Sequence, residues 1–483
     1  MSLNTAQSSP ASRAGVPVHN ILSFGSLGMP LAGLVLIYGV YLPRFYVGLG
    51  ITFIAVSAAI VTVRLIDVVF DPIVALIMDR TKTPLGRYRP WLIAGTPLLL
   101  LGAYKLLMPA GSVNAGYLIL WLLVTYAGLS MLTLGLAAWS AVLATSYHDR
   151  SRVFGFTQGM AVIGSVALLL LPVFTQGKIV AGKAASMPAI GMILIVAIPI
   201  ALILCTVFTP ERIAAGAAKP KFQLKDYWTA ISRPSMLRVI FADLALTLGP
   251  GTTAPLYVYF FHDAKGFSIA DVSFLLIFYI GAGIVGAPVW GLVARKFGKH
   301  RTIQAACVCY AIAQTVLMVL PRVYPGYHRF PDALPTVAGM FAVGFCASAF
   351  LLLIRAMVAD IVDEVRLETK QDLTSLLFSM VTTTTKIGAT VTVFIVFPIL
   401  QFVGYNGKEG VVNTPQAIQG LEMCYLFAPI ILVFGGGLSL IGYKLDAKRH
   451  SEIRQALEQE EAGSHLAAAE ESLVGAAAGA PAE

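Results

Sequence analysis

Three charged side chains lie within an apolar stretch near the N-terminus. The stretch 49–78 is long enough to cross a bilayer, yet it contains Arg64, Asp67 and Asp71. Their spacing of three and then four residues places all three on one face of a helix. Because a lone charge in hydrocarbon is costly, this face must meet a cavity or charged partners. The pattern indicates a cation-binding site at Asp67 and Asp71, with a static ion pair between Arg64 and one aspartate as the alternative.

A further cation lies in a second apolar stretch close to the C-terminus. Lys386 follows a run of four threonines within 374–403. An ammonium group at this depth needs a carboxylate, and Asp67 and Asp71 are the candidates at a similar depth. We therefore expect Lys386 to be a charge partner of the cation site, as Arg64 is. A lysine that extends to the membrane surface is the alternative, although Lys386 is far from both ends of its stretch.

The composition indicates an all-α integral membrane protein. The chain has 483 residues, of which 57% are hydrophobic and 12% charged, and its mean hydropathy is +0.79. A soluble protein carries roughly twice that charged fraction. The apolar runs are continuous, which excludes the short alternating strands of a barrel. We predict about twelve transmembrane helices, at 20–43, 49–78, 91–109, 116–145, 153–175, 186–208, 237–261, 268–293, 302–321, 334–361, 374–403 and 417–443.

The positive charge is distributed by loop. The formal net charge is +9, which in a soluble protein would suggest nucleic acid as a partner. Here the loop lysines and arginines fall on one side of the membrane by roughly three to one, if the N-terminus is cytoplasmic. We therefore expect both termini in the cytoplasm, no nucleic-acid partner, and a multi-pass protein in the plasma (inner) membrane of a bacterium.

The chain divides into two halves of six predicted helices. Its longest basic connection follows the sixth apolar run, and a short cationic turn containing glycine follows the second run of each half. Two parallel six-helix halves are the plan of the major facilitator superfamily. The predicted parts are an N-terminal cytoplasmic tail at 1–19, a six-helix bundle at 20–208, a cytoplasmic linker at 209–236, a second bundle at 237–444 and a C-terminal cytoplasmic tail at 445–483.

A dense group of charges follows the second predicted helix. It lies at the expected cytoplasmic mouth, where charge costs little because water is near. We expect this loop to hold helix ends and to act in gating rather than to contact the substrate. Its candidate residues are Asp79, Arg80, Gly86, Arg87 and Arg89.

Several segments resemble one transporter family. DVVFDP followed by MDRTKTPLGRYRPW is similar to the second helix and following loop of the glycoside–pentoside–hexuronide:cation symporters, typified by the melibiose permease. MVADIVDE, TTTTKIG and PLYVYFF resemble the tenth, eleventh and seventh helices of that family. The resemblance covers most of the chain and implies a secondary active symporter. It also implies that Asp67 and Asp71 form the cation site, beside Lys386 and Arg64.

The same resemblance predicts a substrate cavity that is less polar than in the melibiose permease. Trp139 matches a tryptophan of the sugar cavity. Pro30 and Gly135 stand where melibiose transporters have sugar-binding aspartates, and Thr157 or Gln158 stands in place of an arginine. Recognition of sugar hydroxyls depends on such polar groups. We therefore expect a glycoside-like or amphipathic small molecule. Lysophospholipid is an alternative, because the family resemblance extends to sodium-coupled lysophospholipid carriers.

The residue before Asp71 bears on the identity of the coupling ion. The sodium-using melibiose permeases have an asparagine before the second aspartate, and this chain has Phe70 there. Sodium needs several oxygen ligands, whereas a proton needs a single carboxyl group. The sequence therefore favours H⁺ over Na⁺, with Na⁺ at Asp67 and Asp71 as the alternative.

No pattern in the sequence supports an enzyme. We recognise no phosphate-binding loop, metal-ligand cluster or nucleophile motif, and we expect no cofactor apart from the coupling ion. The expected partners are a small-molecule substrate, a cation and the lipid bilayer, and we expect a monomer. A receptor or assembly factor that does not transport is the alternative function, because a fold does not determine function.

Overall fold

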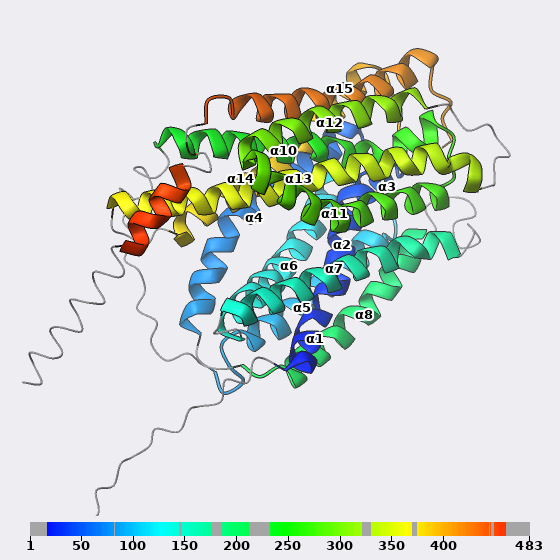
Figure 1. Cartoon of the computed structure of the whole chain (residues 1–483). Coiled ribbons are helices and arrows are strands. Elements are labelled where there is room, and N and C mark those ends of the chain that lie inside the picture. Colours follow the sequence, from blue (N-terminus) through cyan, green and yellow to red (C-terminus); the bar gives the residue numbers. More distant parts are fainter. Residues whose placement is uncertain are drawn as a thin grey trace, which may run out of the picture. The chain divides into compact units, whose positions relative to one another are not determined.

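The computed structural model describes residues 17–459 except 82, 144–146, 175–185, 212–231, 321–329, 370–373, 409, 444 and 446–448. The described part is helical and contains no strand (Figure 1). Most of the predicted N-terminal tail, linker and C-terminal tail lies outside it. Residues 449–459 form a helix, in which His450 contacts Asp360 at 3.3 Å and Asp363 at 3.0 Å.

The helices correspond to the predicted spans. Eleven described helical segments are long and apolar enough to cross a membrane, and a shorter apolar stretch, Gly155–Leu171, supplies the twelfth. The all-α membrane fold is therefore confirmed. The first half contains α1 (Val18–Ser26), α2 (Gly28–Val40), α3 (Leu42–Gly48), α4 (Phe53–Arg80), α5 (Arg89–Leu107), α6 (Ala115–Leu143), α7 (Tyr147–Phe174) and α8 (Ser186–Phe208). The second contains α10 (Pro234–Val258), the π-helix η1 (Tyr259–Ala264), α11 (Ile269–Phe297), α12 (Lys299–Val319), α13 (Phe330–Thr369), α14 (Thr374–Phe402) and α15 (Pro415–Ser439).

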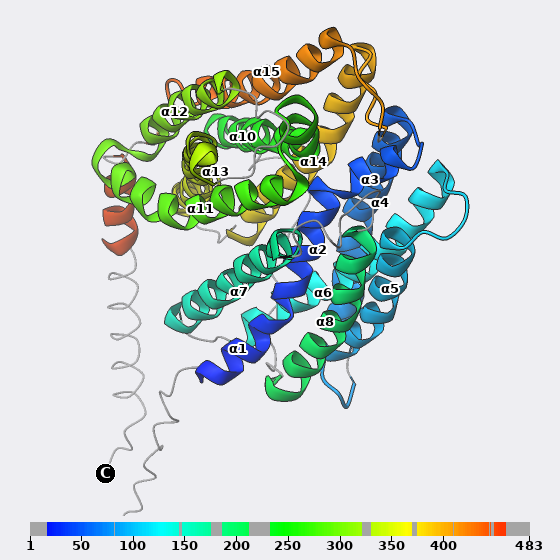
Figure 2. The ribbon, with the colours of Figure 1, turned by 90° about the vertical axis from the view of Figure 1, so that its right-hand side faces the viewer.

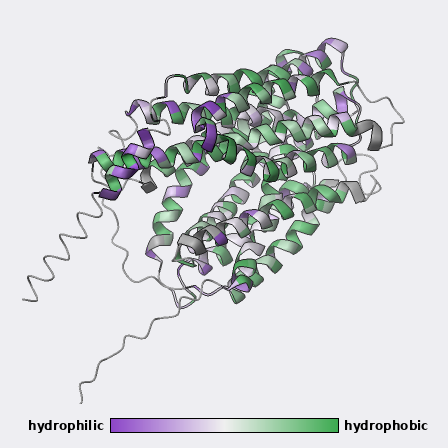
Figure 3. Ribbon diagram, viewed as in Figure 1, coloured by the Kyte–Doolittle hydropathy of each residue, from purple (hydrophilic) through white to green (hydrophobic). Residues whose placement is uncertain are grey.

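The contacts divide the chain into two compact units. Unit 1 contains Met1–Lys219, Pro255–Ile277 and Phe397–Leu421, and unit 2 contains Pro220–Ala254, Phe278–Val396 and Glu422–Glu483. Helices α10 and α14 therefore each contribute one end to unit 1. Apolar residues dominate along the helices (Figure 3), as expected for elements that face either lipid or neighbouring helices.

In unit 1, small residues bring helices into close contact. Helix α5 packs along α6, and α2 packs along α7. A Cβ atom at Gly128 would lie 2.5 Å from the backbone nitrogen of Leu99, and one at Gly164 would lie 2.2 Å from the carbonyl oxygen of Met29. Glycine at these positions permits the close packing that membrane helices use for association. Figure 2 shows α1 and α2 running between α7 and α8.

Unit 2 is packed in the same way. Helix α12 packs along α13. A Cβ atom at Gly344 of α13 would lie 2.2 Å from the carbonyl oxygen of Tyr279 on α11, and one at Gly249 of α10 would lie 2.5 Å from Val433 on α15. These close approaches leave little freedom in how α10, α11, α13 and α15 are placed within the unit.

Candidate functional site

The two aspartates of α4 lie on the buried side of the helix. Asp67 is 7% exposed and Asp71 is 8% exposed. Leu65, Val69 and Ile73, which alternate with them along the helix, are exposed. Helix α4 is continuous through Pro72, so the three-and-four spacing keeps both carboxylates on one face. The apolar face of α4 therefore suits lipid, whereas its acidic face is packed within the protein.

One hydroxyl group forms a hydrogen bond with Asp67. Ser130 on α6 donates a hydrogen bond from Oγ to Asp67 Oδ1 at 2.7 Å, and this is the only described hydrogen bond of that hydroxyl. A serine hydroxyl has one hydrogen to donate. Thr133, one turn further along, donates instead to the carbonyl oxygen of Leu129 at 2.9 Å. The Ser130 hydroxyl is therefore a partner of Asp67 that sequence reasoning did not identify.

Arg64 contacts an aromatic ring. Its guanidinium carbon lies 4.3 Å from the centre of the Tyr126 ring, which is a favourable cation–π distance. Tyr126 in turn meets the ring of Tyr38 edge-on. Among the described ion pairs none joins Arg64 to Asp67, and the described partner of Arg64 is the Tyr126 ring.

Lys386 belongs to the other unit. It lies half-buried on α14, in the part of that helix assigned to unit 2, whereas Asp67 and Asp71 belong to unit 1. Its pairing with one of these aspartates stays a prediction.

Trp139 and Gly135 are packing residues in this conformation. Trp139 is fully buried, its Nε1 donates to the carbonyl oxygen of Pro210 at 3.4 Å, and the Arg89 guanidinium lies 5.6 Å from its ring centre. A Cβ atom at Gly135 would lie 2.4 Å from Leu92 Cδ1. The predicted role of both residues in a substrate cavity is not evident from these contacts and stays a prediction.

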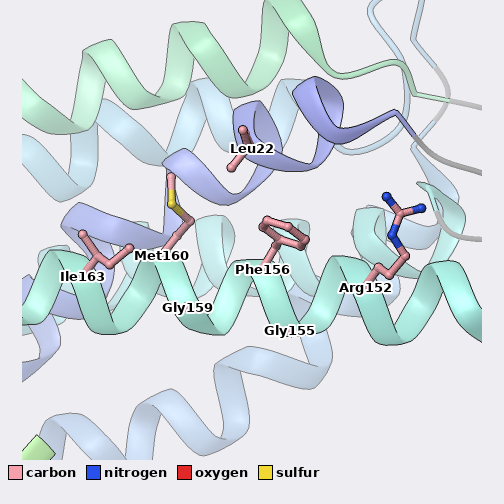
Figure 4. A pocket seen from close by; sticks show the side chains of 7 residues that line it. All are labelled: Leu22, Arg152, Gly155, Phe156, Gly159, Met160 and Ile163. Carbon is pink, nitrogen blue, oxygen red and sulfur yellow. The ribbon is translucent and has the colours of Figure 1, made fainter. Parts of the chain in front are cut away.

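Thr157 and Gln158 lie on α7 beside an apolar hollow. Thr157 packs close to Gly28, Gln158 is exposed, and Pro30 is buried within α2. The hollow has a volume of about 460 Å³ and lies between α1 and α7, with side chains of α7 directed toward Leu22 of α1 (Figure 4). It is lined by Leu22, Arg152, Gly155, Phe156, Gly159, Met160 and Ile163. Arg152 is the one charged residue in that set.

The loop after α4 is held by a carboxylate from the end of α8. Glu211 Oε1 accepts a hydrogen bond from the backbone N–H of Tyr88 at 2.9 Å and another from that of Arg87. A carboxylate at this position satisfies free N–H groups at the start of α5. Arg89 Nη2 also donates to the carbonyl oxygen of Thr209 at 2.8 Å. Arg87 and Arg89 thus lie where the start of α5 is joined to the chain that follows α8, and the expected role of this loop in gating stays a prediction.

The other candidate residues of this loop are Gly86, Arg80 and Asp79. Gly86 has φ +112°, a backbone conformation that favours glycine, and forms an isolated bridge with Thr83. Arg80 is exposed at the end of α4. The side chain of Asp79 lies outside the described residues.

The sequence pattern of one transporter family extends over almost the whole chain. The MFS/sugar transport protein family matches residues 23–447. The chain belongs to this family. The predicted resemblance to sugar–cation symporters of the major facilitator superfamily is thereby confirmed. The protein is a multi-pass membrane transporter rather than an enzyme, as predicted.

Individual relatives share about a quarter of their residues with this transporter. It is 24% identical to the isoprimeverose transporter of Lactiplantibacillus pentosus, over 87% of each chain. It is 25% identical to the human sodium-dependent lysophosphatidylcholine symporter 1, over 81% of this chain and 76% of that one. Its fold is similar to the crystal structure of the nucleoside transporter NupG, with a TM-score of 0.60 and 14% identity over 88% of this chain and 98% of that one.

The transporter also contains an ion pair that connects distant parts of the sequence within unit 1. Arg44 on α3 donates from Nη2 to Asp263 Oδ1 at 2.8 Å and from Nη1 to Oδ2 at 3.1 Å. Tyr405, which follows α14, donates its hydroxyl to the same carboxylate, and the Tyr259 ring lies 4.7 Å from the guanidinium. No sequence spacing relates Arg44 to this carboxylate, because the two residues are 219 positions apart.

Arg44 stays charged and Tyr405 stays protonated in this cluster. Burial raises the pKa of Tyr405, and the Asp263 carboxylate raises it further, so the phenol stays protonated and can donate. Burial opposes the charge on Arg44, but Asp263 raises the pKa of Arg44 overall. Arg44 and Asp263 are only 19% and 22% exposed, so water screens them less than a surface pair.

Proposed function

We propose that this protein is a cation-coupled symporter that carries a glycoside-like or amphipathic small molecule by alternating access, with the cation held at Asp67 and Asp71. The observation that carries the proposal is the packed acidic face of α4, where both aspartates are buried and Asp67 accepts the Ser130 hydroxyl. Family membership supports transport, and similarity to the human sodium-dependent symporter supports coupling to a cation.

The physical basis of coupling is the cost of two buried negative charges. Two carboxylates one helical turn apart in a region of low dielectric repel each other, so the empty site is unfavourable to enclose. A bound cation reduces this cost and lets the protein change conformation with its substrate. Arg64 and the predicted partner Lys386 would hold the site while the cation is absent.

We favour the proton as the coupling ion. Phe70, the residue before Asp71, is half-buried and offers no oxygen ligand. The Thr133 hydroxyl, a possible substitute, is bonded to its own helix. A hard metal cation is bound by several oxygens, whereas a proton occupies one carboxyl group. We therefore expect a proton to be exchanged at the Asp67 and Asp71 pair.

The substrate class has two candidates with separate support. Membership of a sugar transport family and similarity to an isoprimeverose transporter support a glycoside. The hollow beside α7 supports an amphipathic molecule such as a lysophospholipid, because it is apolar with Arg152 as its one charged group. An anionic headgroup at Arg152 and a chain along the apolar residues would suit this lining.

Uptake into proteoliposomes tests the proposal. Isoprimeverose and lysophosphatidylcholine are supplied in turn to vesicles with either a pH gradient or a sodium gradient, at a fixed membrane potential. We expect one of them to accumulate against its gradient when pH alone is imposed. Accumulation that follows sodium alone would contradict proton coupling. Binding without accumulation under either gradient would contradict symport and favour a non-transporting receptor.

A further inference from the structure

A further carboxyl group within a membrane-spanning stretch lies in unit 2. Asp243 on α10 is 2% exposed, so it is more deeply buried than either aspartate of α4. Thr385 Oγ1 on α14 lies 3.0 Å from Asp243 Oδ2. Sequence analysis did not identify Asp243, since it is a single acid within its apolar stretch.

The Thr385 hydroxyl has two possible acceptors and one hydrogen. Its Oγ1 lies 2.9 Å from the carbonyl oxygen of Val381 in the preceding turn, as well as 3.0 Å from Asp243. If Asp243 is ionised, Thr385 can donate to only one of these two oxygens. If Asp243 is protonated, its O–H donates to Thr385, and Thr385 donates to Val381. The neutral acid therefore allows both short contacts of Thr385 Oγ1 to be hydrogen bonds at once, and the ionised acid does not.

The threonine one turn earlier shows the same arrangement with an unambiguous donor. Thr382 Oγ1 donates to the carbonyl oxygen of Phe378 at 2.9 Å and accepts from Arg355 Nη1 at 3.2 Å. A guanidinium group can only donate. Thr385 also donates its hydroxyl hydrogen to its own helix. Its oxygen can then accept a hydrogen bond from a second group. Asp243 can donate this bond only when it is protonated.

Among the described ion pairs none joins Arg355 or Arg238 to Asp243. Arg355 donates to Thr382, one turn before Thr385, and Arg238 on α10 donates to the carbonyl oxygen of Ile441 at 2.6 Å. Lys386 follows Thr385 on α14. The part of α15 that packs on α10, residues 429–437, has no charged side chain. A buried charge in a region of low dielectric is normally paired with an opposite charge, whereas the described partner of Asp243 is the Thr385 hydroxyl.

We propose that Asp243 is a proton-binding site, separate from Asp67 and Asp71, and that the structure describes its protonated state. Loss of the proton leaves a carboxylate that takes the Thr385 hydrogen bond from Val381 and attracts Arg355 away from Thr382. The proton passes to water, and no other bond is made or broken. That this proton moves during each transport cycle rests on the proposed function, whereas its binding to Asp243 does not.

Infrared spectroscopy of the purified full-length protein tests the proposal directly. A protonated carboxyl group has a carbonyl band that is separate from the bands of carboxylates and amides. We expect one such band at neutral pH to be lost in Asp243→Asn and retained in both Asp67→Asn and Asp71→Asn. The asparagine is of similar size, and its amide can donate to Thr385 as the neutral acid does. Identical protonated-carboxyl bands in the wild type and Asp243→Asn, from acid to alkaline pH, would overturn the proposal.

Two threonine variants provide a matched second test. Thr385→Val removes the acceptor of the Asp243 O–H and should shift its carbonyl band to higher frequency. Thr382→Val, one turn earlier on the same helix, removes only the partner of Arg355 and should leave the band position unchanged. An equal shift in both variants, or in neither, would contradict the proposed hydrogen bond. Because the bands are measured without substrate, a failure here is distinguishable from a failure of symport.

Discussion

Asp67 in unit 1 and Asp243 in unit 2 are buried acids that each contact one hydroxyl group. They differ in whether that hydroxyl group has a second hydrogen-bond acceptor nearby. Ser130 has Asp67 as its one described acceptor. Thr385 Oγ1 lies near both Asp243 and the Val381 carbonyl oxygen, and both contacts are hydrogen bonds at once only in the proposed neutral state of Asp243. The nearby arginines also differ, because Arg64 stacks on the Tyr126 ring whereas Arg355 donates to Thr382. A single competing carbonyl group therefore distinguishes two otherwise similar acid–hydroxyl pairs.

Among the variants that test this comparison, Ser130→Ala is expected to have the largest effect on uptake. The substitution removes the described hydroxyl donor of a buried carboxylate, which costs about 1–3 kcal/mol. We expect uphill uptake to fall about tenfold in reconstituted vesicles. Ser140→Ala on the same helix is the control, since its hydroxyl donates only to the Ala137 carbonyl oxygen. An equal loss of uptake in both variants would show that Ser130 has no special role.

The next largest effect is expected at Asp263. This carboxylate accepts hydrogen bonds from Arg44 and Tyr405, whereas Asp67 accepts one from a serine hydroxyl. Arg44→Gln removes a bidentate ion pair, and we expect the outer side of unit 1 to open more often, by about fivefold for a loss of ~1 kcal/mol. The labelling rate of Ser273→Cys by a membrane-impermeant thiol reagent measures this, because Ser273 is buried and its hydroxyl lies 2.9 Å from that of Tyr41.

Two controls accompany the Arg44 measurement. The rate is taken relative to the same protein without Ser273→Cys, because Cys309 is exposed. Arg44→Lys retains the charge but loses the two parallel hydrogen bonds, so its rate should lie between those of the wild type and Arg44→Gln. Unchanged labelling in Arg44→Gln would mean that the pair does not hold this side closed. Because the pKa of Arg44 and that of Tyr405 are both raised, alkaline conditions up to about pH 10 should not release the pair.

A smaller effect is expected from Arg64→Gln. It removes a positive charge one turn before Asp67, and so makes the negative charges of the site less favourable. A proton is then held more readily, and we expect the pH of half-maximal uptake to rise by about one unit. The control is Arg80→Gln at the exposed end of α4. A profile that moves as far in the control would assign the shift to general surface charge.

The smallest expected effect concerns the ion. Phe70→Asn supplies an amide oxygen beside Asp71, and we expect sodium to stimulate uptake by about twofold in the variant and not in the wild type. Phe70→Leu, which supplies no oxygen, should not respond. Sodium stimulation of the wild type itself would show that Phe70 does not exclude this ion.

The predictions from sequence were most accurate where a helix alone sets the geometry. Length and hydropathy predicted the spans, and the spacing of Asp67 and Asp71 predicted that they share one face of α4. Helical periodicity is local, so these conclusions did not require knowledge of the packing. The carboxylate that contacts the loop after α4, Glu211, is more than one hundred residues away and was not identified from the sequence.

The remaining features depend on contacts between distant residues. No sequence spacing relates Ser130 to Asp67, Asp263 to Arg44, or Thr385 to Asp243. Trp139, a position matched by resemblance, is fully buried here against the Pro210 carbonyl oxygen, and its role in a substrate cavity stays a prediction. A signal for Asp243 did exist, since an acid within a membrane-spanning stretch is costly wherever it occurs, and Asp243 lies within the predicted span 237–261.

Uphill accumulation by Asp67→Asn and Asp71→Asn vesicles, measured beside exchange of labelled for unlabelled substrate at equal concentrations, tests the central claim most directly. Exchange needs substrate binding and alternating access, whereas accumulation also needs the coupling cation. We expect each variant to exchange substrate but to reach only the external concentration under an imposed pH gradient. Full uphill accumulation by either variant would show that the carboxylate replaced is not part of the coupling site.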